Sequence, residues 1–273
     1  MSHPRLLYDL LFHCAAESLL EIAADPKHLG ARIGLLAILH TWSQKLTLHP
    51  HLHCLVPAGG LSIDGDWWVR CRRRFLLPVR VLSKLYRGKF LAALQAAAQK
   101  GDLPTAHLPA LDPLYRKPWM VYSKPPFGSP KQVLAYLARY THRVALTNQR
   151  LVRITDEEVT FTWKDYADAE TQRQMTLSGE EFLRRFLLHV LPERFVRIRY
   201  FGLFANRHRE QKVALCRSLL PGPPSPKLAA EKLAGATAAT HRHRSPPLYH
   251  LRPAAMRCIE PLAPVRGRAP PAS

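Results

Sequence analysis

The chain has 273 residues, which is long enough for one large domain or two small ones with a substantial hydrophobic core. It carries 40 Lys and Arg against 20 Asp and Glu, a formal net charge of +20, while 47% of its residues are hydrophobic. This combination is typical of a folded basic protein with a polyanionic partner, nucleic acid before a membrane surface. A purely structural nucleic-acid-binding protein fits the charge equally well.

Several classes of protein are excluded or disfavoured by the sequence. No stretch approaches the roughly 20 apolar residues that a membrane span needs, and the first residues lack a signal-peptide pattern. The five cysteines are widely spaced without a C-x-x-C pair, which argues against a disulfide framework or zinc ribbon and indicates a reducing cytoplasm. Neither phosphate-binding glycine motif is present, so we expect no nucleotide cofactor.

The first hundred residues show helical patterns at each end and extended patterns between them. Apolar spacing predicts a helix over Leu6–Ala24, and a composition of Leu, Ala, Gln and Lys predicts another over Leu82–Lys100. Between these helices, the apolar run over Ile33–Ser43 is expected to form a strand near its C-terminal end, and His51–Pro57 a second strand. A turn at Ala58-Gly59-Gly60 and a hairpin of Leu61–Ile63 with Trp67–Val69 are expected to follow.

The following hundred residues alternate between proline-rich connections, helices and a second hairpin. The expected elements are a connection over Gly101–Pro118, a short strand at Met120–Tyr122, a helix from Ser129-Pro130 to about His142, a hairpin of Leu151–Ile154 with Val159–Trp163, and a helix opened by the capping box of Ser178 and Glu181 that runs to about Val190. The hairpins indicate antiparallel pairing, so the predicted fold class is α+β, an antiparallel sheet flanked by helices.

The C-terminal segment differs in composition from the rest. Residues 221–273 hold 11 of the 24 prolines, eight Lys or Arg, and two Asp or Glu. Such a segment buries too little apolar area to offset its ordering entropy, so we predict a disordered basic tail. The predicted organisation is a folded domain over residues 1–220 followed by this tail over residues 221–273.

A histidine-rich segment, His49-Pro50-His51-Leu52-His53-Cys54, is the first candidate site. Side chains two apart in a strand share a face, so His51 and His53 can bind one metal ion together. The spacing alone is weak evidence, because 14 histidines give such pairs readily by chance. Metal binding and structural burial both remain open at this stage. Gln44 supplies the third ligand if residues 41–44 form a strand that pairs with the histidine strand; otherwise it is a polar turn residue.

Two tyrosines are the second candidate site. Tyr136 and Tyr140 stand four residues apart on the expected helix, so both phenols project from one face. A tyrosine beside a metal can attack a phosphodiester as a covalent nucleophile. The alternative is an ordinary pair of core aromatic residues.

Basic residues near these sites form the candidate nucleic-acid surface. Arginines alternate with aromatic residues from Arg197 to Arg209, a pattern suited to phosphate contacts and base stacking, although a solvated basic helix explains it too. Arg72-Arg73-Arg74 is a further basic run. The candidate DNA-binding residues are Lys131, Arg139, His142, Arg143, Arg197, Arg199, Arg207 and Arg209.

Several of these segments together resemble a known family. His51-Leu52-His53 with the preceding residues 39–44, the paired-tyrosine segment over residues 136–143, and the blocks over residues 177–186 and 197–209 occur in the order found in rolling-circle insertion-sequence transposases of the two-tyrosine HUH endonuclease family. The resemblance covers about residues 6–220. It implies an HUH endonuclease-like antiparallel sheet that carries the histidine pair, with the tyrosine helix packed alongside.

The resemblance also implies a mechanism. His51 and His53 would bind Mg²⁺ or Mn²⁺, with Gln44 at the position of the third ligand. Tyr136 and Tyr140 would attack single-stranded DNA at the element ends and target, giving a 5′-phosphotyrosine and a free 3′-hydroxyl. Compared with the family pattern, an N-terminal cysteine-rich zinc module and a first strand are missing, so we expect a truncated copy.

Two functions of other classes remain as alternatives. One is a non-catalytic protein, an inactive transposase remnant, that only binds DNA and needs neither the histidines nor the tyrosines. The other is a metal-dependent hydrolase that needs the histidines alone. Neither the preferred metal nor the oligomeric state follows from the sequence.

Overall fold

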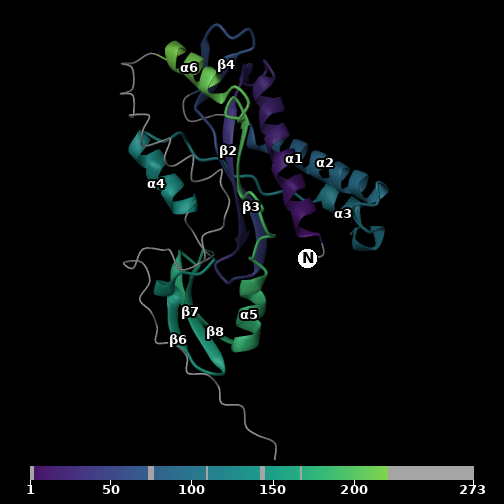
Figure 1. The fold of residues 1–273 in the computed structure, drawn as a ribbon, viewed down its shortest axis with the longest axis vertical. Helices are drawn as coiled ribbons and strands as arrows, with labels where there is room; N and C mark the ends of the chain where they lie inside the picture. Colours follow the sequence, from purple (N-terminus) through teal and green to yellow (C-terminus); the bar gives the residue numbers. More distant parts are fainter. Residues whose placement is uncertain (1–2, 73–76, 109, 142–144, 167, 221–273) are drawn as a thin grey trace, which may run out of the picture. The chain divides into compact units, whose positions relative to one another are not determined.

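The computed structural model describes residues 3–72, 77–108, 110–141, 145–166 and 168–220 (Figure 1). The helices are α1 (Pro4–Ala24), α2 (Val79–Gln99), α3 (Leu111–Arg116), α4 (Pro130–Thr141), α5 (Gly179–Leu187) and α6 (Arg209–Leu219), with 3-10 turns η1 (Thr105–His107) and η2 (Asn148–Arg150). The strands are β1 (Ala31–Arg32), β2 (Gly34–Trp42), β3 (Leu48–Leu55), β4 (Gly59–Ser62), β5 (Trp68–Arg70), β6 (Leu151–Ile154), β7 (Glu158–Asp165), β8 (Thr171–Ser178) and β9 (Ile198–Gly202). The predicted tail over residues 221–273 lies outside the described residues.

These strands pair in antiparallel sheets, which confirms the predicted α+β class. In the central sheet, β2 lies between β3 and β9. The register places His40 opposite His51 and Ile38 opposite His53, while Ala37 pairs with Arg199 on the other side. A second sheet has the order β1-β4-β5, and a third has the order β6-β7-β8.

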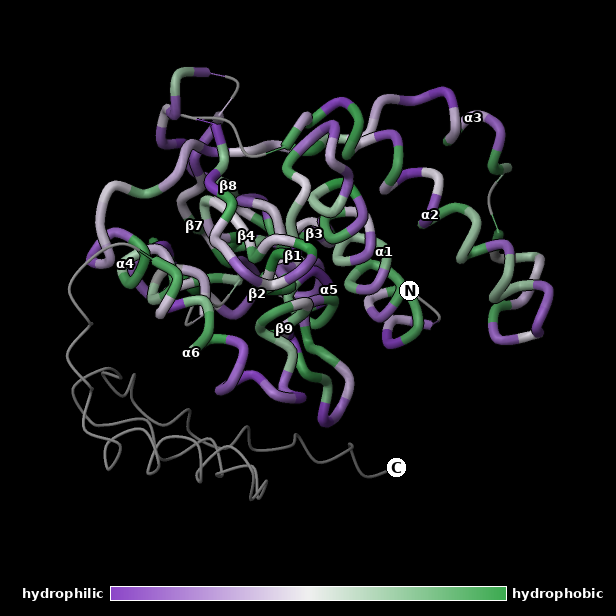
Figure 2. The backbone as a smooth tube through the Cα atoms, turned by 90° about the horizontal axis from the view of Figure 1, so that it is seen from above, coloured by the Kyte–Doolittle hydropathy of each residue, from purple (hydrophilic) through white to green (hydrophobic). Residues whose placement is uncertain are grey.

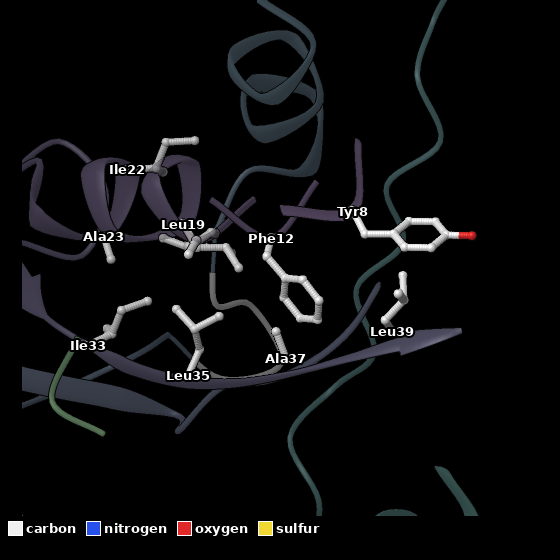
Figure 3. Close-up of a cluster of buried hydrophobic side chains, with 11 residues drawn as sticks. Tyr8, Phe12, Leu19, Ile22, Ala23, Ile33, Leu35, Ala37 and Leu39 are labelled. Atoms are coloured by element: carbon white, nitrogen blue, oxygen red, sulfur yellow. The ribbon is translucent and has the colours of Figure 1, made fainter. Parts of the chain in front are cut away.

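Helix α1 packs on one face of the central sheet and forms the main core. Successive side chains of a strand point to opposite faces, so the odd-numbered residues of β2 share the face that α1 covers. Figure 3 shows the two facing sets of side chains, which are Tyr8, Phe12, Leu19, Ile22 and Ala23 from α1, and Ile33, Leu35, Ala37 and Leu39 below them. The even-numbered residues of β2, including His40, therefore belong to the opposite face.

Helix α4 lies on that opposite face, and both views of the backbone place the β2–β3 pair between α1 and α4 (Figures 1 and 2). The helix begins as predicted after Ser129, whose hydroxyl accepts a hydrogen bond from the Gln132 amide at 3.4 Å. Near its other end, the Nε2 atom of His40 donates to the Tyr140 carbonyl at 3.0 Å. The sheet thus carries an apolar core on one face and imidazoles against a helix on the other.

The third sheet has its own apolar cluster, which reaches the turn that follows β2. Leu46 in that turn is fully buried and forms a cluster with Ala145 and Phe161. Phe182 of α5 packs against the same cluster. Ser178 caps α5 as predicted, because its hydroxyl accepts from the Glu181 amide at 3.3 Å. The carboxylate of Glu181 pairs instead with Arg184 and Arg185, so only one half of the capping box forms.

Three predictions from the sequence are wrong. Gly59 and Gly60 do not form a turn but lie in β4, where a Cβ atom at Gly59 would stand 2.3 Å from the Val69 carbonyl oxygen. Their small size serves close strand packing rather than chain reversal. Residues 120–122 form no strand, since no neighbouring strand pairs with them. The connection over residues 101–118 contains α3. The basic run over residues 197–209, for which a solvated helix was the alternative explanation, includes strand β9 and reaches the start of α6.

Strand β8 is an element that sequence reasoning missed. Its sequence, TQRQMTLS, is polar, and most of its side chains are exposed. Its pairing with β7 from Glu158–Ser178 to Asp165–Thr171 is what makes it a strand. A strand with one solvated face and few apolar residues gives little periodic signal.

Within the residues that the structure describes, no helix is both long and apolar enough to cross a membrane.

Truncation of Phe12 tests the α1 core. Phe12 is fully buried between α1 and the central sheet, so Phe12→Ala should lower the free energy of unfolding by about 3–5 kcal/mol through lost burial and a residual cavity. Glu17→Ala, at an exposed position of the same helix, is the matched control and should change stability little. Urea unfolding followed by circular dichroism measures both, and equal stability of the two variants would contradict the assigned core.

Candidate metal centre and tyrosine pair

Three histidines converge on the face of the central sheet that α4 covers. His51 and His53 stand two apart on β3 and share this face, and the register of β2 brings His40 opposite His51. One ring nitrogen from each lies within 4.8 Å of the others. His40 is buried and the other two are half-buried. This spacing is what one shared metal ion requires.

Hydrogen bonds fix the proton on two of these rings. His40 Nε2 lies 3.0 Å from the Tyr140 carbonyl, and His51 Nδ1 lies 2.7 Å from the His49 carbonyl. Because a carbonyl oxygen only accepts, each of these nitrogens carries the proton in the neutral ring. The other nitrogen of each ring is then a lone-pair donor, as in metal-binding histidines oriented by a carbonyl. Burial lowers the pKa of His51, which favours the neutral form that binds metals.

The predicted third ligand, Gln44, lies elsewhere in the hairpin. Strand β2 ends at Trp42, so the strand expected over residues 41–44 is wrong in its second half. The Ser43 hydroxyl accepts from the amides of Lys45 and Thr47, both at 3.2 Å, and this closes a tight turn that contains Gln44. The Gln44 amide nitrogen donates to the Tyr166 hydroxyl at 3.4 Å. The structure brings His40 into the histidine group, whereas the side-chain amide of Gln44 contacts Tyr166.

His40 is the residue that sequence reasoning missed. It ends a nearly continuous apolar run, in which a single polar side chain gives no periodic signal. Its place follows only from the strand register, because pairing through a tight turn at residues 43–47 puts His40 directly across from His51. If the sequence is paired as a hairpin with its turn at residues 43–47, His40, His51 and His53 fall on one face.

Tyr136 and Tyr140 project from one face of α4, as their spacing on a helix predicts, and both reach this histidine group. Their ring centroids are 4.3 Å apart. The Tyr136 hydroxyl lies 3.3 Å from His53 Nδ1, and the Tyr140 ring lies 4.0 Å from the His53 ring. Burial, reinforced by the neighbouring Tyr140, raises the pKa of Tyr136 to about 12, so its phenol is protonated at neutral pH.

The basic residues predicted to bind DNA divide between exposed and structural positions. Lys131 is exposed on α4, and Arg139 lies on the same helix, but only its backbone is described. His142 and Arg143 lie outside the described residues. Arg207 is exposed, and the Arg209 guanidinium lies 5.5 Å from the centre of the Tyr200 ring.

Arg197 and Arg199 are held within the fold. The Arg197 guanidinium donates a hydrogen bond to the Thr141 carbonyl at the C-terminal end of α4. A positive charge at this position also interacts favourably with the negative end of the helix dipole. Arg199 pairs with Asp9 of α1 and lies 4.3 Å from the centre of the Phe12 ring. Arg197 therefore helps to hold α4 in place, and Arg199 helps to hold α1 on the other face of the sheet.

A sheet face with converging histidines, beside a helix with paired tyrosines, is the arrangement that the two-tyrosine HUH resemblance implies. The family described as "Putative transposase" (Y2_Tnp) matches residues 34–212. The chain belongs to this transposase family, which confirms the resemblance. No solved structure matches the chain significantly.

Two curated relatives extend the comparison. The chain is 55% identical over 226 residues to "Putative transposase y4qJ" of Sinorhizobium fredii, across 79% of this chain and 57% of the relative. It is 30% identical over 241 residues to "Transposase for insertion sequence element IS801" of Pseudomonas savastanoi pv. phaseolicola, across 82% of this chain and 56% of the relative. The chain thus spans a little over half the length of these relatives.

Metal titration distinguishes His40 from Gln44 as the third ligand. We expect the wild type to bind one Mn²⁺ and His40→Ala or His51→Ala to weaken binding by at least about tenfold, whereas Gln44→Ala should leave it unchanged. Binding should also weaken as the pH falls through the histidine pKa values, because protonated rings cannot ligate. Calorimetry with MnCl₂ measures this, and loss of binding in Gln44→Ala with retention in His40→Ala would reverse the assignment.

The anchoring of α4 is tested through Arg197. Arg197→Ala removes a charged hydrogen-bond donor from the Thr141 carbonyl, a contribution of about 1.5–3 kcal/mol, so amides over residues 130–141 should exchange with deuterium several-fold faster. Arg207→Ala removes an exposed arginine and is the matched control. Unchanged exchange over α4 in Arg197→Ala would show that this contact does not hold the helix.

Proposed function

We propose that this chain is the catalytic part of a transposase that cuts and rejoins single-stranded DNA through a 5′-phosphotyrosine, in rolling-circle-type transposition. The observation that carries the proposal is the contact of both tyrosines of α4 with His53, one member of the three-histidine group. If Tyr136 and Tyr140 were only core aromatic residues, their packing would not require three imidazole nitrogens close enough to share a metal ion. Membership in a transposase family, and a relative named for an insertion sequence, agree with this function.

In the proposed cleavage, a tyrosine oxygen attacks the scissile phosphorus. The new bond joins the tyrosine oxygen to the 5′-phosphate, and the bond from phosphorus to the 3′-oxygen breaks. The phenol releases its proton, and the 3′-oxygen takes one up to leave a free 3′-hydroxyl. Because the pKa of Tyr136 is about 12, this phenol keeps its proton until attack, and its hydrogen bond with His53 Nδ1 orients the hydroxyl.

A divalent cation fits the histidine group, and His40, His51 and His53 would hold it. When bound, such an ion would polarise the scissile phosphate and offset negative charge that develops there. Imidazole donors suit Mn²⁺ better than Mg²⁺, which prefers oxygen ligands and would depend on phosphate oxygens from the substrate. We therefore propose Mn²⁺ as the better-matched of the two ions.

Two tyrosines allow two transfers without an external energy source. The phosphotyrosine bond conserves the energy of the broken phosphodiester, so a 3′-hydroxyl can attack it to rejoin the strand. With the tyrosine rings 4.3 Å apart, the second phenol is close enough to take part at the same site. This agrees with the absence of a nucleotide-binding glycine motif in the sequence.

A polyanionic substrate agrees with the charge of the chain. The net charge of +20 favours association with DNA, and exposed Lys131 stands on the helix that carries the tyrosines. Single-stranded DNA at the element ends and at the target is the proposed substrate. Arg207 and Arg209, outside the histidine group, are proposed as phosphate contacts.

A covalent-capture assay tests the proposed function. The chain is incubated with Mn²⁺ and labelled single-stranded DNA from the ends of its own element and then run on a denaturing gel. We expect a protein–DNA adduct that is lost in Tyr136→Phe/Tyr140→Phe and in His51→Ala/His53→Ala. Gln44→Ala is the matched control and should keep the adduct, because its side chain faces Tyr166.

The other outcomes separate the alternatives. Cleavage without an adduct, unaffected by the tyrosine changes, would indicate a metal-dependent hydrolase. Neither cleavage nor adduct, from folded protein that still binds the DNA, would overturn catalysis and leave a DNA-binding protein.

A further inference from the structure

A groove of about 870 Å³ lies outside the histidine and tyrosine residues. One wall is formed by the end of the β3–β4 connection and by β5, and the other by Pro125 and Pro126. The lining is mainly apolar, yet it includes Arg70 and Arg72, and none of the described residues that line it is acidic. A groove of this volume suits a small organic group or a few linked ones.

Strand β5 and its continuation present a regular row of side chains to this groove. Trp68 and Arg70 stand two apart in β5, so they share one face of the strand, and Arg72 follows two residues further along the same lining, which also includes Cys71. Side chains on one face of a strand are about 7 Å apart. The row therefore offers one flat aromatic surface followed by two cations at steps comparable to those between phosphates of an extended nucleic-acid strand.

Gly59 in β4 provides the space for the indole of Trp68. A Cβ atom at position 59 would stand 2.6 Å from Trp68 Nε1 and 3.0 Å from Cε2, closer than real Cβ contacts allow. The indole consequently lies directly against the β4 backbone and stays half-buried. A ring held in this way loses little freedom when a base stacks on it.

Both walls of the groove are joined along the chain to segments that carry residues of the proposed active site. Pro57 in the lining follows His53 by four residues along the chain. On the other wall, Pro126 directly precedes Phe127, whose ring centroid lies 5.2 Å from that of Tyr136. The segment from Pro125 to Phe127 thus links the groove lining to a ring that contacts Tyr136.

We propose that this groove binds nucleotides of single-stranded DNA next to the scissile phosphate. A base stacks on Trp68, and Arg70 and Arg72 contact the phosphates that flank it. The charge of the lining, its single aromatic face and the chain connection of Pro126 to Phe127, which contacts Tyr136, favour an unpaired nucleic-acid strand over an apolar peptide. The position next to the scissile phosphate rests on the proposed function, whereas the stacking contact itself does not.

The test measures binding without chemistry. A fluorescein-labelled oligothymidine of about 12 nucleotides is titrated with the full chain in EDTA, so that no covalent step intervenes. We expect Trp68→Ala to weaken binding about tenfold and Trp68→Phe to restore most of it, because the aromatic face returns. Trp67→Ala is the matched control, since Trp67 is the neighbouring residue, is 55% exposed and does not line the groove.

The salt dependence of binding tests the role of Arg70 and Arg72 separately. Arg70→Ala/Arg72→Ala should weaken binding and also reduce the slope of log affinity against log salt by about 1–2, the expected effect of losing two phosphate contacts. Arg80→Ala, an exposed arginine at the start of α2 outside the groove, should lower the slope by less. Thermal unfolding of each variant confirms that the compared chains are folded.

The outcomes separate this proposal from the proposed function. Binding that depends on Trp68 but yields no adduct in the capture assay would support the groove as a nucleic-acid site and refute the catalytic role. An adduct formed by a chain in which Trp68→Ala binds as tightly as the wild type would overturn the groove and leave catalysis intact. Equal weakening of duplex binding by Trp68→Ala would refute the preference for an unpaired strand.

Discussion

The two faces of strand β2 impose the constraint on which the site depends. One face is filled by Leu35, Ala37 and Leu39 against α1, and this apolar packing fixes the position of the strand. The other face therefore has to hold His40 where α4 covers it. A buried imidazole is costly unless it is hydrogen-bonded, and the Tyr140 carbonyl meets that need. The same contact brings the tyrosine helix to the histidines.

Several of the described contacts that position α4 involve its C-terminal turn. The carbonyls of Tyr140 and Thr141 accept from His40 and Arg197, and the rings of both tyrosines lie against His53. Carbonyls in the last turn of a helix have no partner within the helix, so they are available to anchor it. The polar groups that position the two tyrosines thus also satisfy the helix end.

The large positive charge of the chain serves two different purposes. Arg199, with Asp9 and the Phe12 ring, is part of the packing of α1, so it belongs to the fold. Arg70 and Arg72 instead stand beside Trp68 at a groove whose described lining has no acidic residue. Net charge indicates the class of partner, but only the surroundings of each arginine show which of them face it.

The sequence by itself determined the fold class, most helices, two hairpins and the pairing of Tyr136 with Tyr140, because periodicity and turn residues are local signals. It also indicated His51 and His53 through their spacing on one strand. Only the tertiary structure decided that His40 joins them and that the Gln44 amide contacts Tyr166, since both positions depend on strand register and on the turn at Ser43. Likewise, β8 is a strand because it pairs with β7, which its own polar sequence does not indicate. Gly59 leaves space for the Trp68 indole on the neighbouring strand, and only the pairing of β4 with β5 shows this contact.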